Sequence, residues 1–212
     1  DDETAADTIS EAEPDLQMQL LMSLTPERAA DVLEEMDPDD AVDLLASMEV
    51  EQRESYLELM EDPDSVDMVR LLAFPEDSAG GIMTSEFTTL PLGYTAGEAL
   101  AYLRHSNLAQ EDETLYYVHV IDDESRLKGI LSLRDLVMAD PDESVDGIME
   151  TDPITVSPLV EQEEVARIVA RYNLLEVPVV NEEGVMQGIV TVDDAIDAVI
   201  PTAWKKRLPR FY

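Results

Sequence analysis

A duplication in the second half of the chain constrains the fold more than any other feature. Two stretches, beginning at Gly81 and Gly147 with the letters Gly-Ile-Met, contain the same order of apolar, β-branched and turn residues. Each predicts a β-type segment, a helix, two strands joined by a turn, and a final helix. Each last strand-to-helix turn reads Gly-hydrophobic-x-Ser/Thr-x-x-Asp, at residues 129–135 and 188–194. Helices alternating with short buried hairpins predict an α+β fold, in which helices pack on small sheets.

A second pattern precedes the duplication and has a period of twelve residues. One set of equivalent positions holds Leu33, Leu45, Leu57 and Val69, and another holds Met36, Met48, Met60 and Leu72. Thr25 and Asp37 suit helix N-caps, because each is followed by a proline that suits the first helical position. A helix of two or three turns cannot bury its apolar face alone, so the units predict an all-α superhelical repeat with a Met-rich core.

These patterns divide the chain into six predicted segments. An acidic segment at the N-terminus is expected to be frayed, and a Pro- and Gly-containing stretch is expected to be a linker. The segments are a frayed N-terminus (1–15), a helical repeat domain (16–74), a linker (75–81), a first α+β repeat (82–146), a second α+β repeat (147–200) and a basic tail (201–212).

The charge of the chain is strongly negative, with 49 acidic and 13 basic residues and a net charge of −36. Such a surface repels phosphates, so we expect no nucleic-acid partner. It attracts cations. On charge alone, however, solubility or adaptation to a salty cytoplasm explains the acids better than cation sensing does.

Several classes of site are excluded by residues that the sequence lacks. It contains no Cys, and its two histidines, His105 and His119, cannot build a zinc site by themselves. His119 lies between two valines of a predicted strand and is expected to be structural. No catalytic triad or Gly-rich phosphate loop is present, so we do not expect an enzyme. No apolar run reaches the ~18 residues that span a bilayer, and no signal peptide is visible, so we expect a cytosolic protein or fragment.

The duplicated unit resembles a pair of CBS domains. Three segments together, residues 77–84, 114–118 and 129–141, are similar in a more specific way to the cytosolic region of MgtE magnesium transporters, as are 162–167 and 191–194. This resemblance covers residues 16–200. It implies a tandem CBS pair, a homodimer formed through that pair, a position at the cytoplasmic face of the cell membrane, and a C-terminal transmembrane pore domain that this chain does not contain. Pro201 stands where the family continues into an acidic connecting helix.

Two pairs of acids are candidate Mg²⁺ ligands. Asp39 and Asp43 are four residues apart, and Asp194 and Asp197 are three apart, so each pair shares a helix face. By themselves, acids at the start of a helix are explained by its dipole. The resemblance implies instead that they hold Mg²⁺, the first pair between the helical domain and the CBS pair. The full set of metal positions that it implies is Asp39, Asp43, Gly81 through its backbone oxygen, Glu161, Ala170, Asn173, Asp194 and Asp197. Asn173 stands where the family usually has an acid.

A second group of residues matches the CBS nucleotide motif and could bind ATP or another adenine nucleotide. A hydroxyl can contact phosphate, a carboxylate can accept ribose hydroxyls, and an aromatic ring can stack on a base. The candidates are Tyr117, Ser132, Arg134, Asp135 and Thr191. Helix capping is an equally open explanation for Ser132 and Thr191. In the second repeat, adjacent acids disfavour a phosphate.

The sequence therefore favours a Mg²⁺-sensing regulatory domain of a magnesium transporter or channel. In this hypothesis Mg²⁺ bridges acidic clusters between the helical domain and the CBS dimer and favours a closed, transport-inhibited state. The first alternative is an adenine-nucleotide sensor without a pore, in which the acids only confer solubility. A scaffold whose helical array binds another protein is the second.

Overall fold

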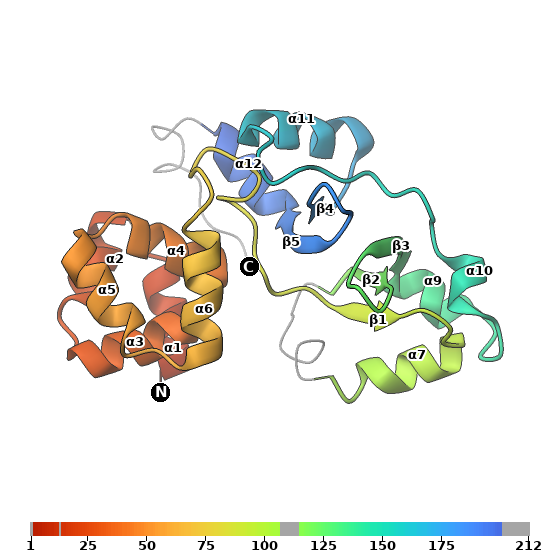
Figure 1. Ribbon diagram of the computed structural model, residues 1–212, viewed down its shortest axis with the longest axis horizontal. Coiled ribbons are helices and arrows are strands. Elements are labelled where there is room, and N and C mark those ends of the chain that lie inside the picture. The colour runs from red at the N-terminus through yellow and green to blue at the C-terminus, as the bar shows by residue number, and fades with distance from the viewer. Residues whose placement is uncertain (1, 13, 107–114, 201–212) are drawn as a thin grey trace. The chain divides into compact units, whose positions relative to one another are not determined.

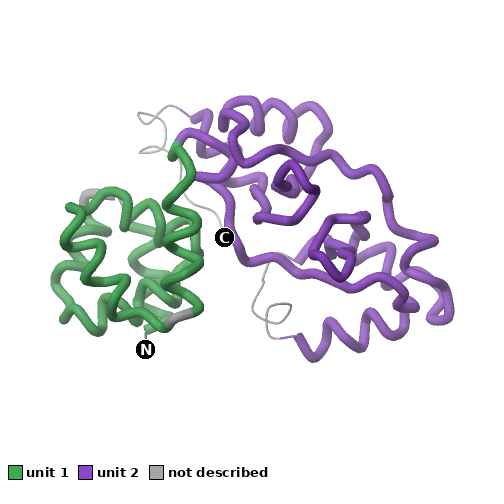
Figure 2. Tube along the Cα trace, in the orientation of Figure 1, with its two compact units in different colours: residues 1–76 green, residues 77–212 purple. Residues whose placement is uncertain are grey.

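The computed structural model describes residues 2–12, 14–106 and 115–200, and the predicted tail 201–212 lies outside them (Figure 1). The chain forms two compact units, residues 1–76 and 77–212 (Figure 2). The division falls within the stretch predicted as a linker. Residues 77–81 are nevertheless part of the second unit, because Ala79 N donates to Val160 O and Gly80 N donates to Pro158 O.

The first unit is all-α, as predicted. Its helices are α1 (Asp2–Ser10), α2 (Pro14–Leu21), α3 (Pro26–Glu34), α4 (Pro38–Ala46), α5 (Val50–Leu57) and α6 (Asp62–Leu71). The N-caps of the last four recur every twelve residues, at Thr25, Asp37, Glu49 and Glu61. Thr25 accepts a hydrogen bond from Arg28 N, whereas the Asp37 side chain makes no capping bond. The twelve-residue period is therefore the spacing between helix starts.

One expectation for this unit is wrong. The N-terminal stretch predicted to be frayed contains a helix, because Asp2–Ser10 form α1, which packs against α3 and buries Ala6 and Ile9. Val69 continues the apolar series of Leu33, Leu45 and Leu57 in the sequence but is 55 % exposed, whereas its neighbour Met68 is buried. The inner helices α3 and α4 bury two adjacent apolar stripes. The terminal helix α6 buries one stripe, since it ends the array.

The second unit has the predicted α+β architecture, with two small sheets and helices around them (Figure 1). In the first sheet, β1 (Thr89–Pro91) runs parallel to β2 (Tyr117–Ile121), which pairs antiparallel with β3 (Leu127–Ser132). In the second sheet, β4 (Glu176–Val180) pairs antiparallel with β5 (Met186–Thr191). The helices are α7 (Ala96–Leu103), α9 (Leu133–Met138), α10 (Val145–Ile148), α11 (Gln162–Tyr172) and α12 (Val192–Val199). The β-type segment predicted at 154–156 is reduced to one bridge, between Val156 and Val179.

The two repeats hold each other through crossed entry segments. Met83 and Thr84, which lead into the first repeat, lie on Gly188 of the second repeat's strand β5. Thr84 and Ile189 exchange backbone hydrogen bonds of 3.0 Å. The segment leading into the second repeat makes the equivalent contact with the first repeat at Gly129. The recurring glycines are therefore places where another backbone must approach closely.

No described helix is long and apolar enough to cross a membrane.

Replacing Gly188 tests the crossed arrangement. A Cβ at this position would lie 2.5 Å from Thr84 O and 2.9 Å from the Met83 side chain, so the backbone would have to move. We expect Gly188→Ala to lower the free energy of unfolding by roughly 1–3 kcal/mol, the usual cost of overpacking. Urea denaturation measures this change.

The matched control is Gly147→Ala in α10, where a Cβ would meet no atom within 4 Å. Alanine is the better helix former, so this variant should be unchanged or more stable by up to about 1 kcal/mol. Equal losses in the two variants would contradict the crossed packing.

Candidate functional site

The acidic pair of the helical unit lies on one helix. Asp39 is half-buried in the first turn of α4, and Asp43 is exposed one turn later. Of the two, only Asp39 lies in the first turn of α4, where the helix dipole favours negative charge. Gly81, the third residue predicted for this metal site, is buried in the other unit.

The remaining metal candidates gather on two packed helices of the second unit. Helix α11 packs against α12. Glu161 is the N-cap of α11, Ala170 lies in its last turns and Asn173 is its C-cap. Half-buried Asp194 and exposed Asp197 belong to α12. The Gly81 segment also reaches this region, because Ser78 forms a bridge with Glu161 and Gly81 N donates to Ser78 O.

Asn173 has a structural explanation that the sequence did not reveal. Its backbone is left-handed, with φ of 54° and ψ of 47°. Asparagine tolerates this conformation better than most residues with a Cβ, and it commonly ends helices in this way. The geometry of the helix end therefore suits the asparagine at a position where the resemblance implies that the family usually has an acid.

In the part of the chain that the structure describes, no group of three or more His, Asp or Glu side chains is arranged to hold a metal ion.

The nucleotide candidates of the first repeat are brought together. Tyr117 on β2 lies opposite Ser132, the last residue of β3 and the N-cap of α9. Ser132 Oγ donates to Asp135 Oδ2 at 2.6 Å, and Asp135 N donates to Ser132 Oγ at 3.0 Å. Arg134 Nη1 lies 3.5 Å from Asp135 Oδ1. One end of the β2–β3 hairpin thus presents a ring, a hydroxyl, a carboxylate and a guanidinium.

The electrostatics around Tyr117 keep its phenol neutral. Burial raises the pKa of the Tyr117 hydroxyl, and the carboxylates of Glu176, Glu150 and Asp135 raise it further. A neutral phenol has an aromatic face for stacking and a hydroxyl that can donate. The same contacts place Glu176, a residue of the second repeat, beside this site.

The second repeat has the same backbone arrangement with different chemistry. Glu176 lies opposite Thr191, as Tyr117 lies opposite Ser132. The Thr191 hydroxyl hydrogen-bonds to the Asp194 carboxylate and makes no helix-capping bond. Here Glu176 replaces the aromatic ring, and Asp193 replaces Arg134. This end of the hairpin suits a cation better than a phosphate.

Sequence reasoning did not single out Glu176. Aligning the two copies strand by strand would have revealed it, because Glu176-Val177 occupies the place of Tyr117-Val118. Its side chain is 9 % exposed, and its Oε1 lies 3.0 Å from His119 Nε2. His119, expected to be structural, is indeed fully buried.

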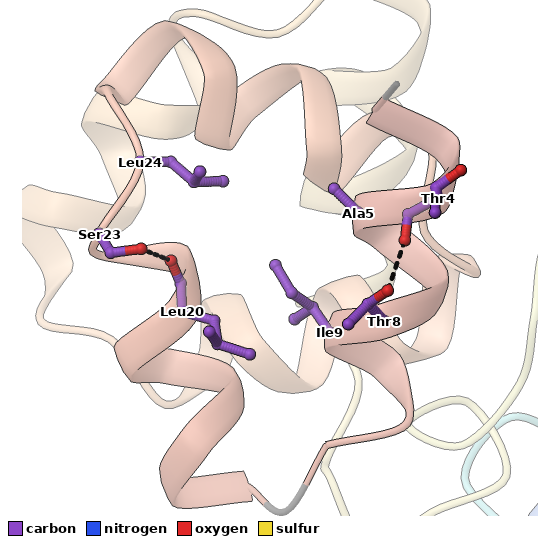
Figure 3. Close-up of a pocket in the computed structure, with 7 residues that line it drawn as sticks. All are labelled: Thr4, Ala5, Thr8, Ile9, Leu20, Ser23 and Leu24. Atoms are coloured by element: carbon purple, nitrogen blue, oxygen red, sulfur yellow. Dashed lines mark hydrogen bonds between the residues drawn. The ribbon is translucent and has the colours of Figure 1, made fainter.

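A pocket of about 320 Å³ lies in the helical unit and contains none of the predicted site residues (Figure 3). It is lined by Thr4, Ala5, Thr8, Ile9, Leu20, Ser23 and Leu24. The Thr8 hydroxyl donates to Thr4 O within α1, and the Ser23 hydroxyl donates from the turn after α2 to Leu20 O. The rest of the lining is mainly apolar.

Two family models match the chain. The MgtE intracellular N domain matches residues 1–77, and the CBS domain matches residues 79–142 and 145–201. The magnesium transporter MgtE of Thermus thermophilus is 47 % identical over 129 residues, which are 61 % of this chain and 28 % of that protein. The chain thus matches less than a third of the length of this relative.

Two solved structures resemble both units. The soluble part of a magnesium transporter is 37 % identical, with a TM-score of 0.87, and the match covers 93 % of this chain and 77 % of that one. The cytosolic domain of the Mg²⁺ channel MgtE in complex with ATP is 39 % identical, with a TM-score of 0.86, over 94 % of this chain and 81 % of that one.

Proposed function

The chain belongs to the MgtE family of magnesium transporters, and from this premise we propose that it is the Mg²⁺-sensing regulatory region of such a transporter. The observation that carries the proposal is the similarity of both units to the cytosolic domain of a Mg²⁺ channel. The proposed location is the cytoplasmic face of the cell membrane, next to a transmembrane pore domain. The proposed role is regulatory rather than enzymatic, with no nucleic-acid partner.

Mg²⁺ suits the exposed acids of both units. It is a hard cation that takes oxygen ligands and keeps several of its waters, so one or two carboxylates from each side of an interface suffice. Without metal, two carboxylates about 5 Å apart repel each other by roughly 3 kcal/mol at an effective dielectric constant near 20. In a chain with 49 acidic and 13 basic residues, few cations are available to offset such repulsion. Contacts between domains are typically small and polar, so this repulsion is large enough to hold them apart.

The proposed mechanism is a linkage between ion binding and domain closure. Mg²⁺ is held by Asp39 and Asp43 on the helical unit and by the backbone oxygen of Gly81. Further ions are held at the second group of positions, which are Glu161, Ala170, Asn173, Asp194 and Asp197. Because these ions bind the closed state more tightly, a rise in Mg²⁺ shifts the population toward it. Closure then inhibits transport, which gives feedback control.

Small-angle X-ray scattering tests the first metal site. We expect the radius of gyration to fall in several millimolar Mg²⁺. In Asp39→Asn/Asp43→Asn, the concentration needed for half of this change should rise about tenfold or more. Each lost charge removes an attraction on the order of 1–2 kcal/mol, and 1.4 kcal/mol corresponds to tenfold in affinity.

The matched control is Glu51→Gln/Glu54→Gln, which removes two exposed acids of α5 and the same net charge. It should compact like the original protein. Compaction that is equally weakened in both variants would reduce the effect to general charge screening, and no compaction in the original protein would contradict the proposal.

A second function is supported by the geometry of the first repeat. Tyr117, Ser132, Arg134 and Asp135 gather at one hairpin end, and the similar channel domain was solved with ATP. We propose that an adenine nucleotide binds there. Tyr117 stacks on the base and Arg134 contacts phosphate. Asp135, already oriented by Ser132, accepts the ribose hydroxyls. The alternative sensor without a pore rests on this same site.

Calorimetry with ATP tests the nucleotide site. Asp135→Ala should weaken binding about tenfold or more, because a hydrogen bond to a charged group contributes about 1.5–3 kcal/mol. Asp194→Ala removes the equivalent acid of the second repeat. In this variant the affinity for ATP should stay within about twofold of that of the original protein. Binding that is insensitive to Asp135 but lost with Asp194 would move the site to the second repeat. Binding in EDTA without any Mg²⁺-induced compaction would favour the pure nucleotide sensor.

A homodimer through the CBS pair is supported by exposed apolar side chains on two helices. Val137 and Met138 of α9, and Ile196 and Val199 of α12, are all exposed, Met138 to 74 %. Single exposed apolar residues are common, but here they recur at the ends of two equivalent helices, which supports a role in an interaction surface. A second copy presents the same surface, as a twofold dimer requires.

Analytical ultracentrifugation tests the dimer. Met138→Asp should raise the dimer dissociation constant about tenfold or more, because a charge buried in the core of an interface is costly. Val66→Asp is the control, since Val66 is an equally exposed apolar residue at 68 % but lies in the helical unit. A dimer weakened only by the Val66 change would place the interface elsewhere.

A further inference from the structure

A buried contact between His119 and Glu176 lies outside the proposed Mg²⁺ and nucleotide sites. His119 lies on β2 of the first repeat, and Glu176 begins β4 of the second repeat. Their side chains are 1 % and 9 % exposed, and His119 Nε2 lies 3.0 Å from Glu176 Oε1. The pair therefore joins the two repeats in a place that water does not reach freely.

The other side of the imidazole fixes its tautomer. His119 Nδ1 lies 3.1 Å from the Thr88 carbonyl oxygen. A carbonyl oxygen only accepts, so Nδ1 must be the donor and carry hydrogen. In a neutral ring, Nε2 then has a lone pair and no hydrogen. That lone pair would face the lone pairs of the Glu176 carboxylate at 3.0 Å.

Two acceptors at this distance in a buried site are unfavourable. Among the described residues, neither His119 Nε2 nor Glu176 Oε1 has an aligned hydrogen-bond partner. A buried polar atom without a partner costs free energy, and a buried unpaired charge costs more. One added proton, on Nε2 or on the carboxyl group, turns the contact into an attractive one.

Several carboxylates lie around the pair, and the Arg134 guanidinium at this hairpin end lies 3.5 Å from the Asp135 carboxylate. Tyr117 on β2 is near Glu176, and the carboxylates of Glu150 and Asp135 are near Tyr117. Thr191, opposite Glu176 on β5, is bonded to the carboxylate of Asp194. Phe87 covers the imidazole edge-on, with ring centroids 5.8 Å apart. A field of acids around a buried acceptor pair favours the uptake of a proton.

We infer that His119 and Glu176 form a buried proton-binding site, and that one shared proton holds the two CBS repeats together. The ligand is a proton, and the site is distinct from the proposed Mg²⁺ positions. It adjoins the proposed nucleotide site at Tyr117, so a link to nucleotide binding rests on that proposed function. The proton site itself does not.

Nuclear magnetic resonance of the full chain, labelled in His and Glu, counts the proton at neutral pH. We expect either hydrogen on both ring nitrogens of His119 or a protonated Glu176 carboxyl group. The chain has two histidines, so a His105→Gln variant assigns the remaining ring signals to His119. His105 is an exposed comparison, because its Nδ1 also faces a carbonyl oxygen, that of Ala101. A neutral His119 beside an ionised Glu176 would overturn the inference.

Glu176→Gln provides the matched variant. The Gln side chain can donate N–H to Nε2 of a neutral His119, so the contact is satisfied without the extra proton. We expect His119 to carry hydrogen on Nδ1 alone in this variant. A ring in the same protonation state with Glu176 and with Gln at this position would also overturn the inference. Should the variant fail to fold, the count in the unchanged protein still decides.

The proposed proton also makes the free energy of unfolding depend on pH. At pH 7 and above, an unfolded chain has few protons on His or Glu side chains. A proton held only by the folded state must be released as the pH rises, so the free energy of unfolding then decreases. Between about pH 7 and about pH 8.5, below the range of Tyr117, the decrease should be steeper in the unchanged protein than in Glu176→Gln. Parallel curves would contradict a proton gained on folding.

Discussion

The second unit depends on one packing constraint, the approach of each repeat's entry segment to a strand glycine of the other repeat. Met83 and Thr84 lie on Gly188, and Met149 and Glu150 lie on Gly129. Because a side chain at either glycine would displace a backbone, the two repeats are folded against each other and not merely joined. The duplicated Gly-Ile-Met motif and the duplicated strand glycine are the two halves of this contact. The candidate sites of this unit lie on strands and helices that this contact holds together.

Two repeats with one backbone plan support different chemistry at equivalent positions. At one hairpin end, Tyr117 and Arg134 can stack and pair with phosphate. At the other end, their places are taken by Glu176 and Asp193. Burial decides how such acids behave. Exposed acids are screened by salt and stay ionised, whereas a buried carboxylate must find a proton, a metal or a donor. The asymmetry of the pair therefore follows from a few side chains rather than from a change of fold.

The sequence was sufficient to predict the features that depend on repeated patterns of residues. The α+β pair follows from the duplication, the helical array follows from the twelve-residue period, and the grouping of Ser132 with Asp135 follows from a spacing of three residues. What it missed depends on distant neighbours. Val69 is exposed because α6, at the end of the array, packs through one face only. The N-terminal segment Asp2–Ser10 is helical because it packs against α3. The contact of His119 with Glu176 joins residues on two strands of different sheets. No period in the sequence connects those two positions.

In the proposed scheme, the acids of this chain act at two depths, and the depth of each acid determines its ligand. A divalent cation would reach Asp43 or Asp197 at the surface and keep most of its water, so the proposed sensing there would respond to ion concentration and weaken with salt. The Glu176 side chain is only 9 % exposed and its Oε1 lies 3.0 Å from His119 Nε2, so Mg²⁺ bound there would have to give up most of its water, which it does reluctantly. A proton needs no shell and can be held by two atoms. In the proposed scheme, the surface of the region therefore responds to the concentration of metal ions, while the junction between its repeats responds to pH.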